Sequence, residues 1–105
     1  IMWIGLNDGW LSVVENLNDK GALLVRARKL SHLTNAFPDC DHFKDPHADY
    51  PFRAYIPRSI VADVIGDRII AIDYPNFKGF VREGKLLSAY HSIWGALLDA
   101  FRSER

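Results

Sequence analysis

The chain has 105 residues, which suits one domain, and its 49% apolar and 25% charged residues are typical of a globular protein rather than a disordered one. Its 13 basic and 13 acidic side chains give a formal net charge of zero, which argues against a protein that binds nucleic acid mainly by wrapping phosphates. One cysteine excludes an internal disulfide and fits a reducing compartment, so we predict a cytoplasmic protein.

The first ten residues, "IMWIGLNDGW", lack the basic start and the apolar core of a signal peptide. No apolar run in the sequence approaches the roughly 18–20 residues that span a bilayer, so we predict no membrane partner. Ile1 precedes Met2, and we interpret Met2 as the natural start of a single domain that covers 1–105.

The first third of the chain predicts three strands joined by two short turns. Apolar, β-prone residues fill 2–6, 10–16 and 22–28, which read "MWIGL", "WLSVVEN" and "ALLVRAR". The intervening "NDG" and "LNDKG" are turn signals. Connections this short indicate an antiparallel meander.

A short helix and a fourth strand are predicted next. Apolar residues recur at helical spacing over 29–37, and Pro38 ends this pattern. A polar loop with three prolines follows at 38–51, and "FRAYI" at 52–56 has the composition of a strand.

A longer helix is predicted after Pro57, which is well placed to open it. Its apolar residues recur at helical spacing: Ile60, Val61, Val64, Ile65, Ile69 and Ile72. Gly66 weakens the middle of this helix by roughly 1 kcal/mol relative to alanine. A break at Gly66, with "RIIAI" (68–72) as a strand, is therefore an alternative.

The last helix has the clearest pattern, after a connector at 73–79. One apolar stripe contains Leu86, Tyr90, Ile93, Trp94, Leu97 and Phe101. We expect the stripe to dock on the sheet, although the same period suits a homodimer interface. The elements together predict an α+β domain, with an antiparallel sheet of three to four strands (a β-meander plus one) and about three helices packed on one face.

Several stretches resemble a small family of bacterial and phage-associated proteins of about this length. They are "MWIGLND", "LLVRAR", "DYPFRA", "IDYPNFK" and the closing "AYHSIW" helix, and together they cover nearly the whole chain. The resemblance implies a bacterial or phage setting, in which small accessory proteins often bind host macromolecules. It implies no catalytic residue, binding residue or cofactor.

The stretch "DCDHFKDPHADY" (39–50) gathers the residue types that bind metals. Cys40, His42 and His47 give a C-x-H-x4-H spacing, which departs from the paired ligands of structural zinc sites. Aspartate and proline also form turns, so we interpret the stretch as a solvated acidic loop and predict no metal ion. A metal-dependent enzyme at 39–49 remains an alternative. The loop's aspartates are candidate binding residues: Asp39, Asp41, Asp45 and Asp49.

A second candidate site is a basic sheet face. Alternation along the strands places Arg26, Arg28, Arg53 and Tyr55 on one side. Such a face could bind phosphates and stack bases, or it could be the polar outer face of an open sheet. The loop at 39–49 has four aspartates and one lysine, so it is net −3 and the remainder is net +3. This polarity suits electrostatic steering to a partner.

The connector and the tryptophans supply the remaining candidates. Asn76 and Lys78 lie in a short loop with aromatic neighbours, which is typical of binding loops, although Asn76 could instead cap the next helix. We expect at least two of Trp3, Trp10 and Trp94 to lie in the core. An exposed Trp10 would indicate an interface anchor.

Catalysis is poorly supported by the motifs. The sequence contains no Gly-rich phosphate loop, G-x-S-x-G elbow or H-E-x-x-H helix, and we predict no catalytic residue and no cofactor. Cys40 is a weak nucleophile candidate, because neighbouring carboxylates raise a thiol pKa. We therefore predict a non-catalytic phage or mobile-element accessory protein that binds a host protein, for example an anti-CRISPR-like inhibitor of a host defence complex. The alternatives are a nucleic-acid binder that uses the arginine face and a metal-dependent enzyme.

Overall fold

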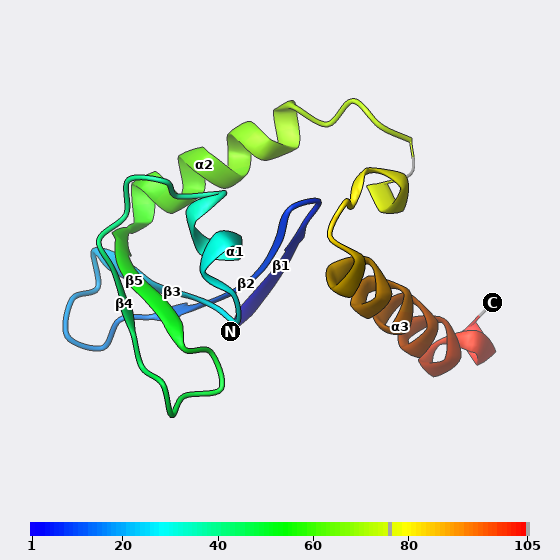
Figure 1. Ribbon diagram of the computed structural model, residues 1–105, viewed down its shortest axis with the longest axis horizontal. Coiled ribbons are helices and arrows are strands. Elements are labelled where there is room, and N and C mark those ends of the chain that lie inside the picture. Colours follow the sequence, from blue (N-terminus) through cyan, green and yellow to red (C-terminus); the bar gives the residue numbers. More distant parts are fainter. Residues whose placement is uncertain (76, 105) are drawn as a thin grey trace.

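A computed structural model describes residues 1–75 and 77–104, with the backbone alone for Phe77 and Lys78. Five antiparallel strands form one sheet in the order β1-β2-β3-β5-β4 (Figure 1). The strands are β1 Met2–Leu6, β2 Gly9–Glu15, β3 Ala22–Ala27, β4 His42–Lys44 and β5 Phe52–Pro57. The first three form the predicted meander, and the α+β prediction is confirmed.

The sheet has one strand more than the predicted three to four. β4 lies inside the segment that we predicted to be a loop, and it pairs with β5 through His42↔Ala54, Phe43↔Arg53 and Lys44↔Phe52. A three-residue strand is too short to show the alternation of apolar and polar residues from which strands are recognised. Its formation depends on the exposed edge of β5, which the local sequence does not reveal.

Within residues 1–75 and 77–104, three α-helices complete the fold. They are α1 Leu30–Thr34, α2 Arg58–Ile70 and α3 Gly84–Ala100, and 3₁₀ turns occupy Phe77–Phe80 and Arg102–Glu104. α2 continues through Gly66 to Ile70, so the prediction of one helix is right and the alternative of a strand at 68–72 is wrong. Among the described residues, no helix is long and apolar enough to cross a membrane.

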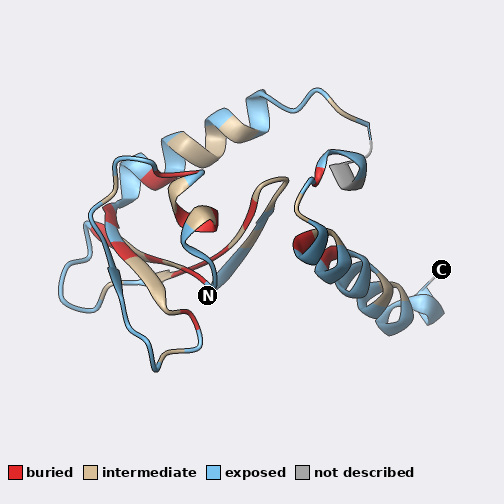
Figure 2. Cartoon of the chain, in the orientation of Figure 1, coloured by how far each residue is buried: buried red, intermediate tan, exposed pale blue. Residues whose placement is uncertain are grey.

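The main core lies between one face of the sheet and the helices α1 and α2. Leu11, Val25, Leu33 and Ala54 are each fully buried in it. The strand register places Leu11, Val25 and Ala54 on the same face, because opposed residues of an antiparallel pair share a face. In Figure 2 the buried residues accordingly concentrate in the strands and α1.

α3 departs from the predicted packing of all helices on one face. Its buried residues are Leu86 and Tyr90, which pack with Val81 and Trp10 in a separate small cluster. Trp10 alternates with Leu11 along β2 and so faces away from the main core. Beyond Tyr90 the helix projects from the body and is mostly exposed (Figure 2). The radius of gyration is 14.9 Å, compared with about 13 Å for a compact domain of this length.

Candidate functional site

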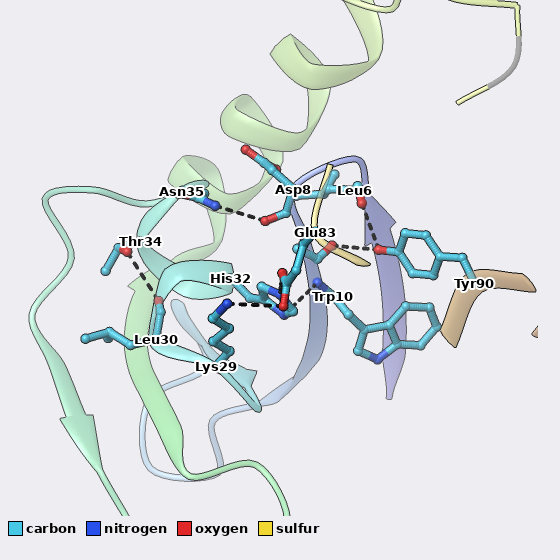
Figure 3. Close-up of polar contacts among 11 residues, drawn as sticks. Leu6, Asp8, Trp10, Lys29, Leu30, His32, Thr34, Asn35, Glu83 and Tyr90 are labelled. Carbon is cyan, nitrogen blue, oxygen red and sulfur yellow. Dashed lines mark hydrogen bonds and ion pairs between the residues drawn. The ribbon is translucent and has the colours of Figure 1, made fainter. Parts of the chain in front are cut away.

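The β1–β2 hairpin joins all three helices. From α2, the Arg68 guanidinium donates two hydrogen bonds to the Asp8 carboxylate, at 2.9 and 3.1 Å. The Asn35 amide, which follows α1, donates to the Asp8 carbonyl oxygen at 2.9 Å (Figure 3). A bidentate arginine–carboxylate contact fixes the relative orientation of the two side chains as well as stabilising the fold. The tip of the hairpin is therefore held rigidly against α1 and α2.

α3 is attached to the same hairpin from the other side. The Tyr90 hydroxyl lies 2.7 Å from the carbonyl oxygen of Leu6 and 2.9 Å from that of Gly9, so these two acceptors share its one proton (Figure 3). Burial raises the pKa of Tyr90, and the Asp8 and Glu83 carboxylates raise it further. The hydroxyl therefore remains a protonated donor. Tyr90 also packs against the Trp10 ring, with 6.0 Å between ring centroids.

A histidine links α1, β2 and the start of α3. His32 Nδ1 accepts a hydrogen bond from the Trp10 backbone N–H at 3.4 Å, so Nε2 carries the proton and donates to Glu83 at 2.6 Å. Lys29 Nζ donates to the other Glu83 oxygen at 3.2 Å. These contacts use both ring nitrogens of His32, which leaves no free lone pair for general-base catalysis. The His32–Glu83 pair therefore positions α3.

Glu83 gives this link a pH dependence. The hydrogen bond from His32 lowers the pKa of Glu83 below its ordinary value of 4.5, with a further contribution from Lys29, although burial acts in the opposite direction. A carboxyl group whose folded-state pKa is lowered contributes stability that is fully present above its unfolded-state pKa. That contribution is lost as the pH falls through the folded-state pKa.

We therefore expect wild type to be more stable than Glu83→Gln at pH 7, with a difference that begins to shrink as the pH falls below about 4.5 and is lost once the pH is below the lowered folded-state pKa. Thermal unfolding of both proteins from pH 7 to pH 3 measures this. Both proteins contain His32 and Lys29, so the comparison isolates the carboxyl group. A difference that stays constant across the range would contradict this role of Glu83.

An apolar groove of about 430 Å³ lies between α3 and the outer face of β1 and β2. Trp3, Trp10, Leu86, Ala89 and Ile93 supply its apolar walls. The Trp3 and Trp10 rings contact each other, with 5.9 Å between centroids. The groove is thus open, aromatic and bordered on one side by β1.

Two further grooves border β1 on the opposite face of the sheet, next to α2. One has a volume of about 350 Å³ and includes Ile4, Ile69 and Ile72. The other has a volume of about 840 Å³ and includes Met2, Ile4 and Ile69. β1 therefore has accessible apolar surface on both of its faces.

We call the exposed apolar side chains of this strand, of the end of α2 and of α3 the β1 edge surface. Its members are Met2, Trp3, Ile69, Ile72, Ile93, Leu97 and Phe101. Leu97 and Phe101 continue the stripe of Ile93 at four-residue spacing along α3. Met2, Trp3 and Ile69 are each 63% exposed, and Phe101 is 60% exposed. So much large exposed apolar surface on β1 and the helices beside it is typical of an interaction site.

Two predictions are corrected by these exposures. The α3 stripe docks only through its first half, because Leu97 and Phe101 lie beyond the end of the small cluster. The expectation of at least two core tryptophans is wrong, since Trp3 and Trp94 are 63% and 57% exposed and Trp10 is half-buried. The exposed anchor is Trp3 on the edge strand rather than Trp10.

The arginines of the predicted basic face share one side of the sheet but engage protein groups. Arg26 lies opposite Arg53, and Arg26 donates to Ser12 Oγ at 2.7 Å. Arg53 Nε donates to the Tyr50 carbonyl oxygen at 3.0 Å. The Arg26 and Arg28 guanidinium groups lie 4.9 and 4.1 Å from the centroid of the Tyr50 ring. These contacts reduce the surface that the arginines offer to phosphates.

Asp49 of the acidic loop and Tyr55 of the basic face also contact other side chains of the chain. Asp49 accepts from Arg28 at 3.0 Å, so the acidic loop and the arginine face do meet. Both side chains are more than half exposed, and such pairs contribute little stability. Tyr55 stacks against Phe43, with 5.5 Å between centroids.

The remaining aspartates are dispersed. Asp39 and Asp41 flank Cys40 beside a groove of about 340 Å³, and Asp45 Oδ1 accepts from the His47 N–H at 3.3 Å within a turn. In the described part of the chain, no group of three or more His, Cys, Asp or Glu side chains is placed to hold a metal ion. Burial raises the pKa of the Cys40 thiol, and the adjacent aspartates add to this effect, which lowers its nucleophilicity.

Two predicted binding residues are not tested. Asn76 lies outside the described residues, and the side chain of Lys78 is not described.

Comparison with known proteins supplies no relative: the chain matches no protein-family model, no curated protein and no solved structure.

Proposed function

We propose that this protein is a non-catalytic module that binds another protein chain along the β1 edge surface. The observation that carries the proposal is that large apolar side chains of β1, α2 and α3 remain exposed, and that apolar grooves border β1 on both of its faces. Burial of apolar surface is the main favourable term in most protein association. A strand with an open edge also adds main-chain hydrogen bonds to a partner strand.

The composition of α3 supports the proposal. Its 17 residues include one acidic side chain, Asp99, one lysine, Lys85, and one histidine, His91. A helix with so few charges normally lies in a core, because water does not favour an apolar surface on all sides. α3 instead projects from the body after Tyr90, so a partner would provide the missing burial.

The alternatives have less support. His32 has no free ring nitrogen, and the arginines of the basic face contact Ser12, Tyr50 and Asp49. The finer prediction of a phage accessory protein that inhibits a host defence complex has no supporting contact in the described residues, and it stays a prediction.

Photo-crosslinking tests the proposed surface. A photoreactive phenylalanine at position 3 or 97 is expected to form adducts with a protein chain in cells that express this protein. Position 55 is the matched control, because Tyr55 is 52% exposed and aromatic but lies outside the β1 edge surface. Adducts of equal yield at all three positions, or none at positions 3 and 97, would contradict the proposal.

A further inference from the structure

We infer that the chain bound at the β1 edge is a second copy of this protein, paired antiparallel through β1 about a two-fold axis at Ile4. The inference rests on the proposed function, because it names the occupant of the same surface. It follows from the chemistry of the two sheet edges, the direction of the β1 backbone groups and the self-complementarity of the β1 side chains.

The two edges of the sheet differ in chemistry. β1 carries no charge and no proline along Met2–Leu6. β4, at the opposite edge, is three residues long, contains Lys44 and is flanked by Asp41 and Asp45. Short edge strands with charged side chains prevent pairing with other chains, whereas exposed apolar edge strands promote it. The β1 edge therefore has the chemistry of an edge that pairs.

The outward backbone groups of β1 can be identified from a contact in β2. The Trp10 N–H donates to His32 and therefore does not bond to Gly5, its opposite residue in β1. Hydrogen-bonded and non-bonded pairs alternate along an antiparallel ladder. Met2, Ile4 and Leu6 therefore bond to β2. The N–H and C=O groups of Trp3 and Gly5 point to the open edge.

A two-fold axis at Ile4 lets the outward N–H and C=O groups of Trp3 and Gly5 all form hydrogen bonds to the second copy. It places Trp3 opposite Gly5 of the second copy and Gly5 opposite Trp3 of the second copy. Both pairs occupy positions at which two residues exchange two N–H···O=C bonds. The two Ile4 residues lie opposite each other at a non-bonded position. The interface is thus isologous, as a two-fold dimer requires.

The side chains favour this register over its neighbours. Trp3 lies opposite a residue without a side chain, so no second large side chain opposes the indole in the strand pair. The Trp10 ring and the Tyr90 hydroxyl lie over Gly5, 3.5 Å from the position of a Cβ atom, and the indole would pack against them at the groove. Shifting the axis to Trp3 would oppose two indoles, and shifting it to Gly5 would oppose Trp3 to Asn7. The large–small pairing at Ile4 avoids both arrangements.

The strand alone would not hold a dimer. Stable interfaces bury roughly 800 Å² per partner, and whole aromatic side chains present roughly 150–250 Å² each. Trp3 at 63% exposure therefore supplies a fraction of that area. An axis perpendicular to the sheet keeps the two α3 helices on one side, where Ile93, Leu97 and Phe101 add the area that the strands lack. Two-fold pairing thus covers the open edge of β1 and Trp3 on both copies.

Sedimentation equilibrium from 1 to 200 µM tests the stoichiometry. We expect a mass of about 24 kDa, twice the 12.0 kDa of the chain, at the upper concentrations. Trp3→Lys is expected to weaken the dimer at least about tenfold, because it places a charge at the edge and removes an aromatic anchor. A mass of 12.0 kDa throughout the range would overturn the inference.

Disulfide trapping tests the register. In a Cys40→Ala background, Ile4→Cys is expected to oxidise to a covalent dimer, because opposed residues at a non-bonded position have Cα atoms about 4.5 Å apart, within disulfide range. Met2→Cys is the matched control, since Met2 lies opposite Leu6 and roughly 13 Å along the strand from Met2 of the second copy. Equal trapping of both variants, or none of Ile4→Cys, would overturn this register.

The same experiments separate the two proposals. A monomer whose position 3 crosslinks to a chain of another mass would overturn the second copy as occupant and leave the proposed function intact. A monomer without adducts at positions 3 and 97 would overturn both.

Discussion

Replacing Tyr90 by alanine is expected to release α3 from the body of the protein. Tyr90 and Leu86 are the buried residues of this helix, and Tyr90 bonds to Leu6 and Gly9 at the hairpin. Loss of a buried aromatic side chain costs about 3–5 kcal/mol. A free helix of this length is marginal in water, so α3 should melt as well as undock.

Hydrogen–deuterium exchange measures this directly. Amides of 84–100 are expected to exchange rapidly in Tyr90→Ala, while those of β2, β3 and β5 remain protected by the main core. Tyr90→Phe is the matched control, because it keeps the ring and removes the hydroxyl, at a cost of about 1 kcal/mol. Slow exchange over 84–100 in Tyr90→Ala would mean that contacts other than Tyr90 hold the helix.

The strands and helices were largely predictable because each has a local pattern of sufficient length. Apolar, β-prone residues fill 2–6, 10–16 and 22–28 between turn residues, and α3 repeats apolar residues over four turns. β4 has no comparable pattern, since three residues form a strand only by pairing with β5. α1 ends at Thr34, before the predicted 37, because apolar spacing identifies buried residues rather than helix ends.

The site was less predictable than the fold because it depends on contacts between distant residues. His32 and Glu83 are separated by 51 positions, and no local motif connects them. The α3 stripe indicated a buried face but not which half would be buried within one chain. One signal was present in the sequence: the scarcity of charge along α3 indicates more burial than one sheet face provides.

The arginine face forms on one side of the sheet as predicted, but its arginines contact other groups of the protein. Alternation correctly placed Arg26 and Arg53 on one side of the sheet, where the strand register sets them opposite each other. Tyr50, in the acidic loop, contacts three arginines of that face. Its ring packs against the Arg26 and Arg28 guanidinium groups, and its carbonyl oxygen accepts a hydrogen bond from Arg53. Strand periodicity identifies which side chains share a face, but loop contacts determine which remain available.

Gly9→Ala is expected to destabilise the protein by about 2 kcal/mol through a clash between β2 and α1. A Cβ atom at Gly9 would lie 2.9 Å from the Cα and 3.0 Å from the carbonyl oxygen of His32. Both are backbone atoms, so α1 must move as a unit. That displacement would also disturb the Trp10–His32–Glu83 link, and thereby the start of α3. For a domain of this size the melting temperature should fall by roughly 8–16 °C.

Gly5→Ala is the matched control in the neighbouring strand. Its Cβ atom would lie 3.5 Å from the Trp10 ring and 3.5 Å from the Tyr90 hydroxyl, which are ordinary contacts. Both alanine variants are best compared by urea unfolding in a Trp3→Lys background, so that association does not contribute to stability. If Gly9→Ala and Gly5→Ala lose equal stability, the loss reflects the replacement of glycine in a strand. If only Gly9→Ala loses stability, the close contact of α1 with β2 positions the groove and α3.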